Sequence, residues 1–449
     1  MVSHIISTIS PAMFSFGLVL MMILVLLSLR DPFLVFSMSF PAFIFGEVIR
    51  TFFPISVSAF TAIFFIAATI GALANGYRFR LDKVQGCFLA LIIMIAASLR
   101  YSYSPDYGKD KIILLTFVIA PVVILGPILI DNLAKLRKVF SVYYFTLSAY
   151  VLYSLFLFIL RNISGRFGAL HDPIFAGQIF GATFLVSFIL LSNVRGSNLK
   201  KIYALPVGIL ALYFSLMSGT RAAVFAGITT ICVYYWLIGV NIFRQLIKKP
   251  LKSYISSLII IIVFLIIPVG LKSLLPEDIY LERYSSIDRF FYIGDAKQPD
   301  SRTEHYMLAI DCFKTSPLTG IGVGGYKAEY ESYKEGSLTR IDSRYPVYPH
   351  NIFLEIASEE GIIAVFLFLI IIIFLSKSFV KIRWFYSYNK SIEAVSIACL
   401  CFYGFIVAQT SLDISKHIFF WWGMGNILAI DRVIGRHVRE KISYGRNQS

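Results

Sequence analysis

Residues 352–376 read IFLEIASEEGIIAVFLFLIIIIFLS, and no charged residue occurs after Glu360 in this stretch. A helix needs roughly 20 mostly apolar residues to cross about 30 Å of hydrocarbon. Backbone polar groups inside a bilayer must bond within their own segment, so this run predicts a membrane-spanning helix. Similar runs recur along the chain, at residues 8–29, 31–49, 55–76, 84–100, 112–131, 139–160, 173–193, 202–217, 221–241, 254–273, 391–411 and 417–431.

The composition of the whole chain fits this interpretation. Hydrophobic residues make up 57% of the 449 residues and charged residues only 15%, whereas soluble domains carry about 25% charged residues. Such a chain cannot cover an aqueous surface in the ordinary way. The sequence therefore predicts an all-α polytopic membrane protein with about 12–13 transmembrane helices and one large loop containing short helices.

The formal net charge of +15 is explained by the positions of the basic residues. Lys and Arg cluster in every second loop between the apolar runs, which is the pattern that holds loops on the cytoplasmic side. We therefore expect no nucleic-acid partner. The clusters are Arg78, Arg80 and Lys83; Lys135, Arg137 and Lys138; Arg195, Lys200 and Lys201; Arg244, Lys248, Lys249 and Lys252; Lys377, Lys381, Arg383 and Lys390; and Arg432, Arg436, Arg439 and Lys441.

This orientation divides the chain into four predicted parts. An N-terminal transmembrane bundle covers residues 1–273, and a large loop on the outer face covers residues 274–351. The C-terminal transmembrane helices cover residues 352–431, and residues 432–449 form a basic cytoplasmic tail. The loop holds nine Lys/Arg against twelve Asp/Glu, and it is much longer than an ordinary connection. We expect it to be a domain of its own.

The motif SGTRAAVF places Arg221 between two apolar runs at the outer face. An arginine at a membrane boundary can simply reach toward the headgroups. It can also bind an anionic group, because guanidinium pairs with phosphate oxygens through two parallel hydrogen bonds. The small neighbours of Arg221 would let a bulky ligand approach, and both interpretations remain open at this point.

A second motif, SRTEHYMLAIDCFKTSPLTGIGVGGY, lies within the large loop. Arg302 opens a predicted helix, which the turn-rich SPLTGIGVGG segment ends. The glycines of that segment, Gly322 among them, either let backbone amides approach a ligand or make tight turns. Arg283 and Arg289 are further cations of the loop, either solvated or available to a substrate.

A third motif, YPHNIFLEIASEEG, marks the return of the chain into the membrane. His350 can be structural, or its imidazole can take a proton from an attacking hydroxyl, because its ordinary pKa lies near neutral pH. Glu355 and Glu359 follow Asn351 at helical spacing and share a face. Their carboxylates can orient the imidazole, hold ligand hydroxyls or serve packing.

The order of these motifs resembles the O-antigen ligase and O-antigen polymerase superfamily. In that family a histidine–asparagine motif follows a large periplasmic loop, as His350 and Asn351 do here. The similarity is carried by SGTR, by PLTGIG and by PHNIFLEIASEEGIIA. It implies a bacterial inner-membrane protein with several spans and an active site that faces the periplasm.

The resemblance implies a glycosyltransferase without metal or other cofactor, whose donor is an undecaprenyl-diphosphate-linked oligosaccharide. Carried over by motif, Arg221 and Arg302 would bind the diphosphate and His350 would assist the acceptor hydroxyl. These three are the expected catalytic residues, and Asn351, Arg289, Arg283, Glu355 and Gly322 are expected to bind substrate. The acceptor is a glycan or the lipid A core, with membrane lipids as surroundings and a chain-length regulator as a candidate partner.

Polymerase and ligase differ only in the acceptor. The spacings from Arg166 to Gly177 and from Arg283 to Gly294 resemble a polymerase pattern and favour a polymerase slightly, although one such match is expected by chance. A polysaccharide transporter or flippase is the alternative from another class. It would predict inverted repeats or charges deep within several helices, and neither is clear in the sequence.

Overall fold

The computed structural model describes residues 11–52, 55–160, 167–193, 198–239, 301–335 and 347–446. Within these ranges every regular element is helical, and no strand occurs. Six of the described helices are long and apolar enough to cross a membrane: Val57–Ala74, Lys83–Tyr101, Pro105–Leu129, Leu133–Leu160, Pro173–Ser192 and Ile352–Asn389. The protein is an all-α polytopic membrane protein, as the sequence predicts.

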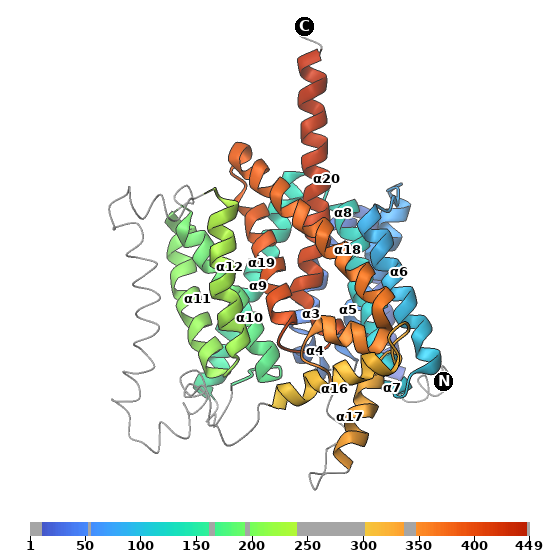
Figure 1. Ribbon diagram of the computed structural model, residues 1–449. Coiled ribbons are helices and arrows are strands. Elements are labelled where there is room, and N and C mark those ends of the chain that lie inside the picture. Colours follow the sequence, from blue (N-terminus) through green and yellow to red (C-terminus); the bar gives the residue numbers. More distant parts are fainter. Residues whose placement is uncertain are drawn as a thin grey trace. The chain divides into compact units, whose positions relative to one another are not determined.

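The chain forms two compact units. Unit 1 comprises residues 1–146, 299–381 and 404–449. Its helices are α2 (Pro11–Arg30), α3 (Pro32–Ile44), α4 (Gly46–Phe52), α5 (Val57–Ala74), α6 (Lys83–Ser98), α7 (Pro105–Leu114), α8 (Ala120–Leu129), α16 (Ser301–Thr315), α17 (Gly325–Glu335), α20 (Ile418–Arg446) and most of α18 (Ile352–Asn389). A π-helical turn, Leu115–Ile119, joins α7 to α8. Figure 1 shows α16 and α17 at the end of this unit where α18 begins.

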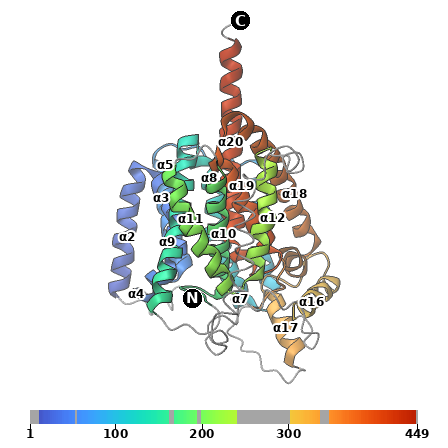
Figure 2. The same cartoon turned by 90° about the vertical axis from the view of Figure 1, so that its left-hand side faces the viewer.

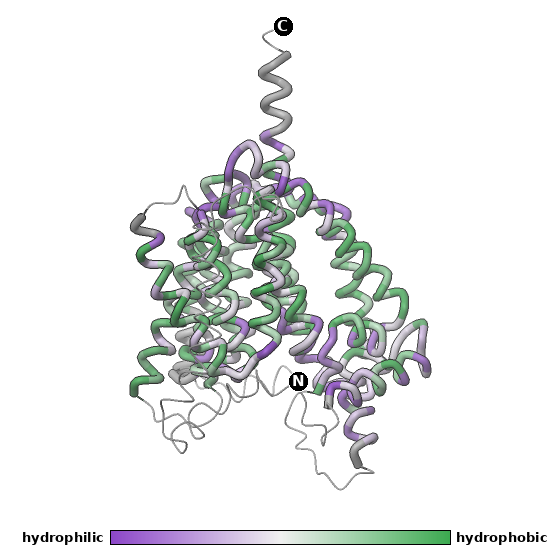
Figure 3. Tube along the Cα trace, turned by 60° about the vertical axis from the view of Figure 1, so that its left-hand side comes forward, coloured by the Kyte–Doolittle hydropathy of each residue, from purple (hydrophilic) through white to green (hydrophobic). Residues whose placement is uncertain are grey.

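Unit 2 comprises residues 147–298 and 382–403. It contains α10 (Pro173–Ser192), α11 (Asn198–Met217), α12 (Arg221–Leu237), the second half of α9 (Leu133–Leu160) and most of α19 (Ile392–Ala408). Helices α10, α11 and α12 lie side by side (Figures 1 and 2). The helices of both units are apolar along their middle turns, and polar residues gather toward their ends (Figure 3).

Most predicted spans correspond to described helices, with differences at their ends. The span predicted at 31–49 is divided, because α3 ends at Ile44 and α4 begins at Gly46. The span predicted from residue 112 begins earlier, at Pro105, and α18 continues to Asn389. The span at 254–273 lies outside the described residues, as do the parts 274–300 and 336–346 of the predicted outer loop.

Small residues set the close packing of α8 against α20. A Cβ added to Gly425 would lie 2.6 Å from the Val122 carbonyl, and one added to Gly126 would lie 3.1 Å from the Gly425 carbonyl. In a membrane, such small residues let helix backbones approach closely and gain dispersion contacts. Beside this contact the side-chain amide nitrogen of Asn426 donates to the Tyr143 hydroxyl at 2.9 Å. This packing fixes α20, whose preceding loop reaches the candidate site.

Candidate active site

The SPLTGIG and EEG motifs meet at a break in α18. Gly361 interrupts the helix with φ 75° and ψ −173°, a backbone conformation that is essentially restricted to glycine. A break leaves backbone groups that must find other partners. Here Ile362 N–H donates to the Pro317 carbonyl at 2.9 Å, and Ile321 and Gly322 N–H donate to the carbonyls of Ser358 and Glu359 at 3.0 and 2.9 Å.

This contact explains why the glycines of the loop are needed. A Cβ added to Gly320 would lie 2.2 Å from the Glu359 carbonyl carbon, and one added to Gly322 would lie 2.6 Å from Ser102 Cα. Both glycines have positive φ, 67° and 86°, where other residues are strained. The structure thus places Gly322 at a close approach of two backbones, with its N–H bonded to Glu359. Its predicted contact with substrate stays a prediction.

A buried lysine holds the first two turns of α18. Lys111 of α7 is 1% exposed and lies 2.6 Å from Glu355 Oε1 and 2.8 Å from Glu359 Oε2. The shared face of the two glutamates is therefore confirmed. Because an unpaired buried charge is costly, the three side chains are held together. One residue further, the Glu360 carboxylate accepts a hydrogen bond from the Ser98 hydroxyl at 3.0 Å.

The loop before α20 joins the same cluster. Glu355 Oε2 accepts the Ile414 backbone N–H at 2.9 Å, and Asp413 accepts the Tyr107 hydroxyl at 3.1 Å. Burial raises the pKa of Asp413, but the ammonium groups of Lys416 and Lys111 outweigh it and hold that pKa well below its usual range. Asp413 is therefore ionised although it is buried. Its bond to Tyr107 links the 413–417 turn to α7.

His350 precedes this clamped helix and has an unusual backbone. Its φ is 59°, a left-handed conformation that costs a residue with a Cβ roughly 1–2 kcal/mol. Asn351 caps α18, because its Oδ1 accepts the N–H groups of Phe353 and Leu354 at 3.0 and 3.1 Å. The Asn351 amide also donates to Gln409 Oε1 at 3.3 Å. The predicted pair His350–Asn351 thus forms the N-terminal boundary of α18.

Aromatic side chains surround the His350 imidazole. The ring of Tyr348 lies 4.6 Å away and that of His305 5.1 Å away, both edge-on. His305 stacks on Tyr330 at 4.4 Å and lies 2.8 Å through Nδ1 from the Tyr326 hydroxyl. Two histidines, one from α16 and one before α18, therefore belong to one aromatic cluster.

The Tyr326 hydroxyl contacts His305 twice. Burial raises the pKa of Tyr326, so the hydroxyl keeps its proton. It lies 3.1 Å from the His305 carbonyl and 2.8 Å from His305 Nδ1. Tyr326 therefore holds both the backbone and the ring of His305.

Arg302 lies in the first turn of α16, three residues before His305, and is exposed. Residues three apart share a helix face, so Arg302 belongs to the face that carries His305. The helix predicted to begin at Arg302 is confirmed by α16. Below it, Ala309, Cys312 and Tyr326 form a small buried core that joins α16 to α17.

Arg221 belongs to unit 2, where it is the first residue of α12 and is exposed. The turn before it is well fixed. Thr220 Oγ1 donates to the Pro173 carbonyl at 3.1 Å, and Ser218 Oγ donates to the Ser215 carbonyl at 2.7 Å. A Cβ on Gly177 would lie 2.4 Å from Ser218 Oγ. Gly177 therefore has a packing role beside the SGTR turn.

The structure brings His350, Asn351, Glu355 and Gly322 together within unit 1, with Arg302 on the adjoining helix. Arg283 and Arg289 lie outside the described residues, as do Arg166 and Gly294 of the polymerase-like spacing. The site also contains Lys111, His305 and Asp413, which none of the sequence motifs predicted. A lysine at the edge of an apolar run was the available signal, because a charge within a membrane span is a functional candidate by default.

These features define a multi-pass membrane protein with a polar site built on a broken, clamped helix. Residues 206–369, which include Arg221, Arg302 and His350, match the family model described as O-antigen ligase. This match confirms the resemblance of the chain to the O-antigen ligase superfamily over that segment. A protein of Rickettsia conorii (strain ATCC VR-613 / Malish 7), named as a candidate polysaccharide ligase, is 28% identical over 233 residues. The aligned region covers 50% of this chain and 49% of that relative, about half of each.

Proposed function

We propose that this protein transfers an undecaprenyl-diphosphate-linked glycan to an acceptor hydroxyl at the periplasmic face of the inner membrane. The acceptor oxygen attacks the anomeric carbon as the bond from that carbon to the diphosphate oxygen breaks. The hydroxyl proton passes to His350, and the leaving diphosphate keeps the bonding electron pair. No metal is assigned to the reaction.

The observation that carries this proposal is the backbone of His350. A strained left-handed residue persists only where its surroundings hold it, and such residues cluster at functional sites. His350 is held by the cap at Asn351 and by α18 beyond it, whose first turns are fixed by Lys111. An imidazole held in this way can meet an acceptor hydroxyl at a constant distance, as general-base catalysis requires.

Arg302 and Arg221 are the proposed partners of the diphosphate. Charge grows on the leaving group in the transition state, so fixed cations stabilise that state more than the ground state. Arg302 shares a helix face with His305, whose ring touches that of His350. Arg221 follows a turn fixed by two hydroxyl hydrogen bonds. Arg283 and Arg289 are proposed as further contacts of the donor.

Lys111 and Glu355 receive a positioning role in this proposal. Both oxygens of Glu355 are engaged, one by Lys111 and one by Ile414 N–H. The carboxylate therefore aligns the helix that carries His350 and the turn before α20. Asn351, whose side chain spans from α18 to Gln409, fixes the same boundary.

Polymerase and ligase remain the two forms of this function. Both the matching family model and the Rickettsia relative are described as ligases, whereas the arginine–glycine spacing favours a polymerase slightly. Deletion of the gene followed by gel analysis of lipopolysaccharide separates them. Core with a single repeat unit indicates a polymerase, and core without any repeat indicates a ligase.

The deletion strain also tests the site residues, when genes encoding single variants are introduced into it. We expect His350→Ala and Arg302→Ala to abolish long-chain surface polysaccharide at unchanged protein level. Loss of the protein together with the polymer would assign these residues to folding and contradict the site. Unchanged polymer would contradict the proposed roles directly.

A further inference from the structure

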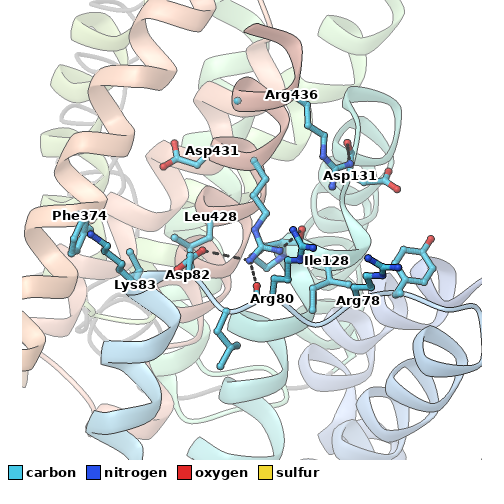
Figure 4. Close-up of a pocket in the computed structure, with 16 residues that line it drawn as sticks. Arg78, Arg80, Asp82, Lys83, Ile128, Asp131, Phe374, Leu428, Asp431 and Arg436 are labelled. Carbon is cyan, nitrogen blue, oxygen red and sulfur yellow. Dashed lines mark hydrogen bonds and ion pairs between the residues drawn. The ribbon is translucent and has the colours of Figure 1, made fainter. Parts of the chain in front are cut away.

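A cavity of about 770 Å³ lies in unit 1 at the beginning of α6 and the end of α8, beside middle turns of α18 and α20. It is built from the 77–84 segment, from Pro127 to Asp131, from Phe374 and from Leu428 to Arg436 (Figure 4). Helix α6 begins at Lys83 beside the cavity and ends at Ser98, whose hydroxyl donates to Glu360 next to the candidate active site. At about 1.5 Å per residue this is roughly 22 Å of helix rise, so the cavity and the candidate active site lie at opposite ends of α6.

Cations outnumber carboxylates around this cavity. Its wall holds Arg78, Arg80, Lys83, Arg432 and Arg436 against Asp82, Asp131 and Asp431. Two of the three carboxylates are already paired with lysines outside the wall, Asp131 with Lys135 at 3.0 Å and Asp431 with Lys381 at 2.9 Å. The cavity therefore carries a surplus of positive charge.

Arg432 forms the fixed part of this charge. It is half-buried, and its guanidinium donates to the Arg80 carbonyl at 2.7 Å and to Gln85 Oε1 at 2.9 Å. Asp82, which caps α6, lies 3.6 Å from it. Arg436 donates to the Asp131 carbonyl at 3.1 Å. These bonds hold the floor of the cavity in place.

The remaining cations stand at the rim. Within the described ranges, no carboxylate lies within ion-pair distance of Arg78, Arg80 or Lys83, and all three side chains are exposed. Figure 4 shows them on the segment that leads into α6. A phosphate group entering the cavity would meet charge that no acidic side chain neutralises.

The wall also has an apolar part. Leu81, Ile128, Phe374 and Leu428 line the same cavity, and Leu81 is 53% exposed. A soluble anion has no apolar group to contact such a surface, whereas the glycerol and first methylene groups of a lipid can pack against it. The cytoplasmic leaflet, where the basic clusters place this face, carries anionic lipids that attract basic groups.

We propose that this cavity binds the phosphodiester headgroup of an anionic membrane phospholipid, with Arg78, Arg80 and Lys83 contacting the phosphate. The apolar residues of the wall contact the upper part of the lipid. The site is separate from the glycan site and independent of the reaction carried out there.

The test uses the purified full-length protein in detergent, titrated with phosphatidylglycerol and followed by native mass spectrometry. Phosphatidylcholine serves as the zwitterionic lipid and inorganic phosphate as the soluble anion. Removing two charges in Arg80→Gln/Lys83→Gln is expected to weaken phosphatidylglycerol binding roughly 30-fold. The double variant Arg30→Gln/Lys138→Gln removes one arginine and one lysine that are exposed and lie outside the cavity wall, and it should bind like the unaltered protein.

Each outcome decides the proposal. Selective binding of phosphatidylglycerol that only the cavity variant loses supports it. Equal loss in both variants would indicate general charge attraction and overturn the site. Inorganic phosphate that binds as tightly as the lipid, in the same variant-dependent manner, would overturn the lipid assignment. The side chains of Arg80 and Lys83 make no hydrogen bond with any other described residue, so we expect both substitutions to leave folding intact, and equal unfolding temperatures without lipid verify this.

Discussion

The ammonium group of Lys111 lies 2.6 Å from a carboxylate oxygen of Glu355, although 244 positions separate the two residues. This ion pair joins α7 to the first turn of α18, directly after His350 and Asn351. A second carboxylate, Glu359, completes it one turn further along α18. The site therefore depends on a contact that no local stretch of sequence contains.

Removing Lys111 is expected to be severely destabilising. Lys111→Met leaves two carboxylates buried without their cation, and losing one partner of a buried pair costs about 3–5 kcal/mol. We expect a clearly lower unfolding temperature of the purified protein and loss of surface polysaccharide. Lys109→Met is the matched control, because Lys109 pairs with Asp106 at the surface and such pairs contribute about 0–1 kcal/mol. Equal unfolding temperatures for both variants would contradict the positioning role of Lys111.

Gly361→Ala is expected to disrupt the site through the backbone. A Cβ at this position would lie 2.3 Å from the Leu318 carbonyl oxygen, and φ is 75°. We expect low yield in the membrane and exposure of the SPLTGIG loop to protease. Gly86→Ala is the control, because a Cβ there meets nothing within 4 Å and alanine is the better helix former. Normal yield and protease resistance for Gly361→Ala would show that α18 does not need its break.

Arg221→Lys tests whether a diphosphate is gripped by two parallel hydrogen bonds. Lysine keeps the charge but lacks the planar fork of guanidinium, so activity should fall at least about tenfold. Polysaccharide length and amount on gels, at equal protein level, measure the effect. Arg50→Lys changes an exposed arginine paired with Glu47 and should have no effect. Full activity of Arg221→Lys would contradict the bidentate contact and would indicate that Arg221 only contacts lipid headgroups.

The depressed pKa of Asp413 predicts how stability responds to acid. A carboxylate whose folded pKa lies below its unfolded value stabilises the protein above the unfolded pKa, near 4. That stabilisation is lost as the pH falls through the folded-state pKa. The contribution of Asp413 to stability is therefore constant between about pH 6 and 8. Unfolding temperature should thus fall more steeply below about pH 4 in the unaltered protein than in Asp413→Asn. Parallel curves would place the acid sensitivity elsewhere.

Much of the fold could be predicted from hydropathy alone. The span predicted at 55–76 corresponds to α5 at Val57–Ala74, and that at 173–193 to α10 at Pro173–Ser192. Length and apolar character suffice because a bilayer leaves few alternatives to a helix. The helical spacing of Glu355 and Glu359 was likewise sufficient to place both on one face.

The contacts of the site could not be predicted in this way. Lys111 stands one residue before the run predicted from residue 112, and hydropathy gives no reason to include it in a span. Its partners are set by how α7 packs against α18, which is a tertiary property. The same holds for His305, whose sequence neighbours do not reveal that its ring meets that of His350.

The His350 side chain is proposed to take part directly in glycosyl transfer. Purified protein supplied with an undecaprenyl-diphosphate-linked oligosaccharide and an acceptor should release undecaprenyl diphosphate and form a new glycosidic bond. His350→Gly removes the imidazole, and the relief of about 1 kcal/mol of backbone strain offsets part of the lost ring contacts and of the chain entropy of glycine, so this variant should fold yet transfer no glycan. Transfer at an undiminished rate by the stable His350→Gly protein, or passage of the lipid across vesicles without a new glycosidic bond, would contradict the account.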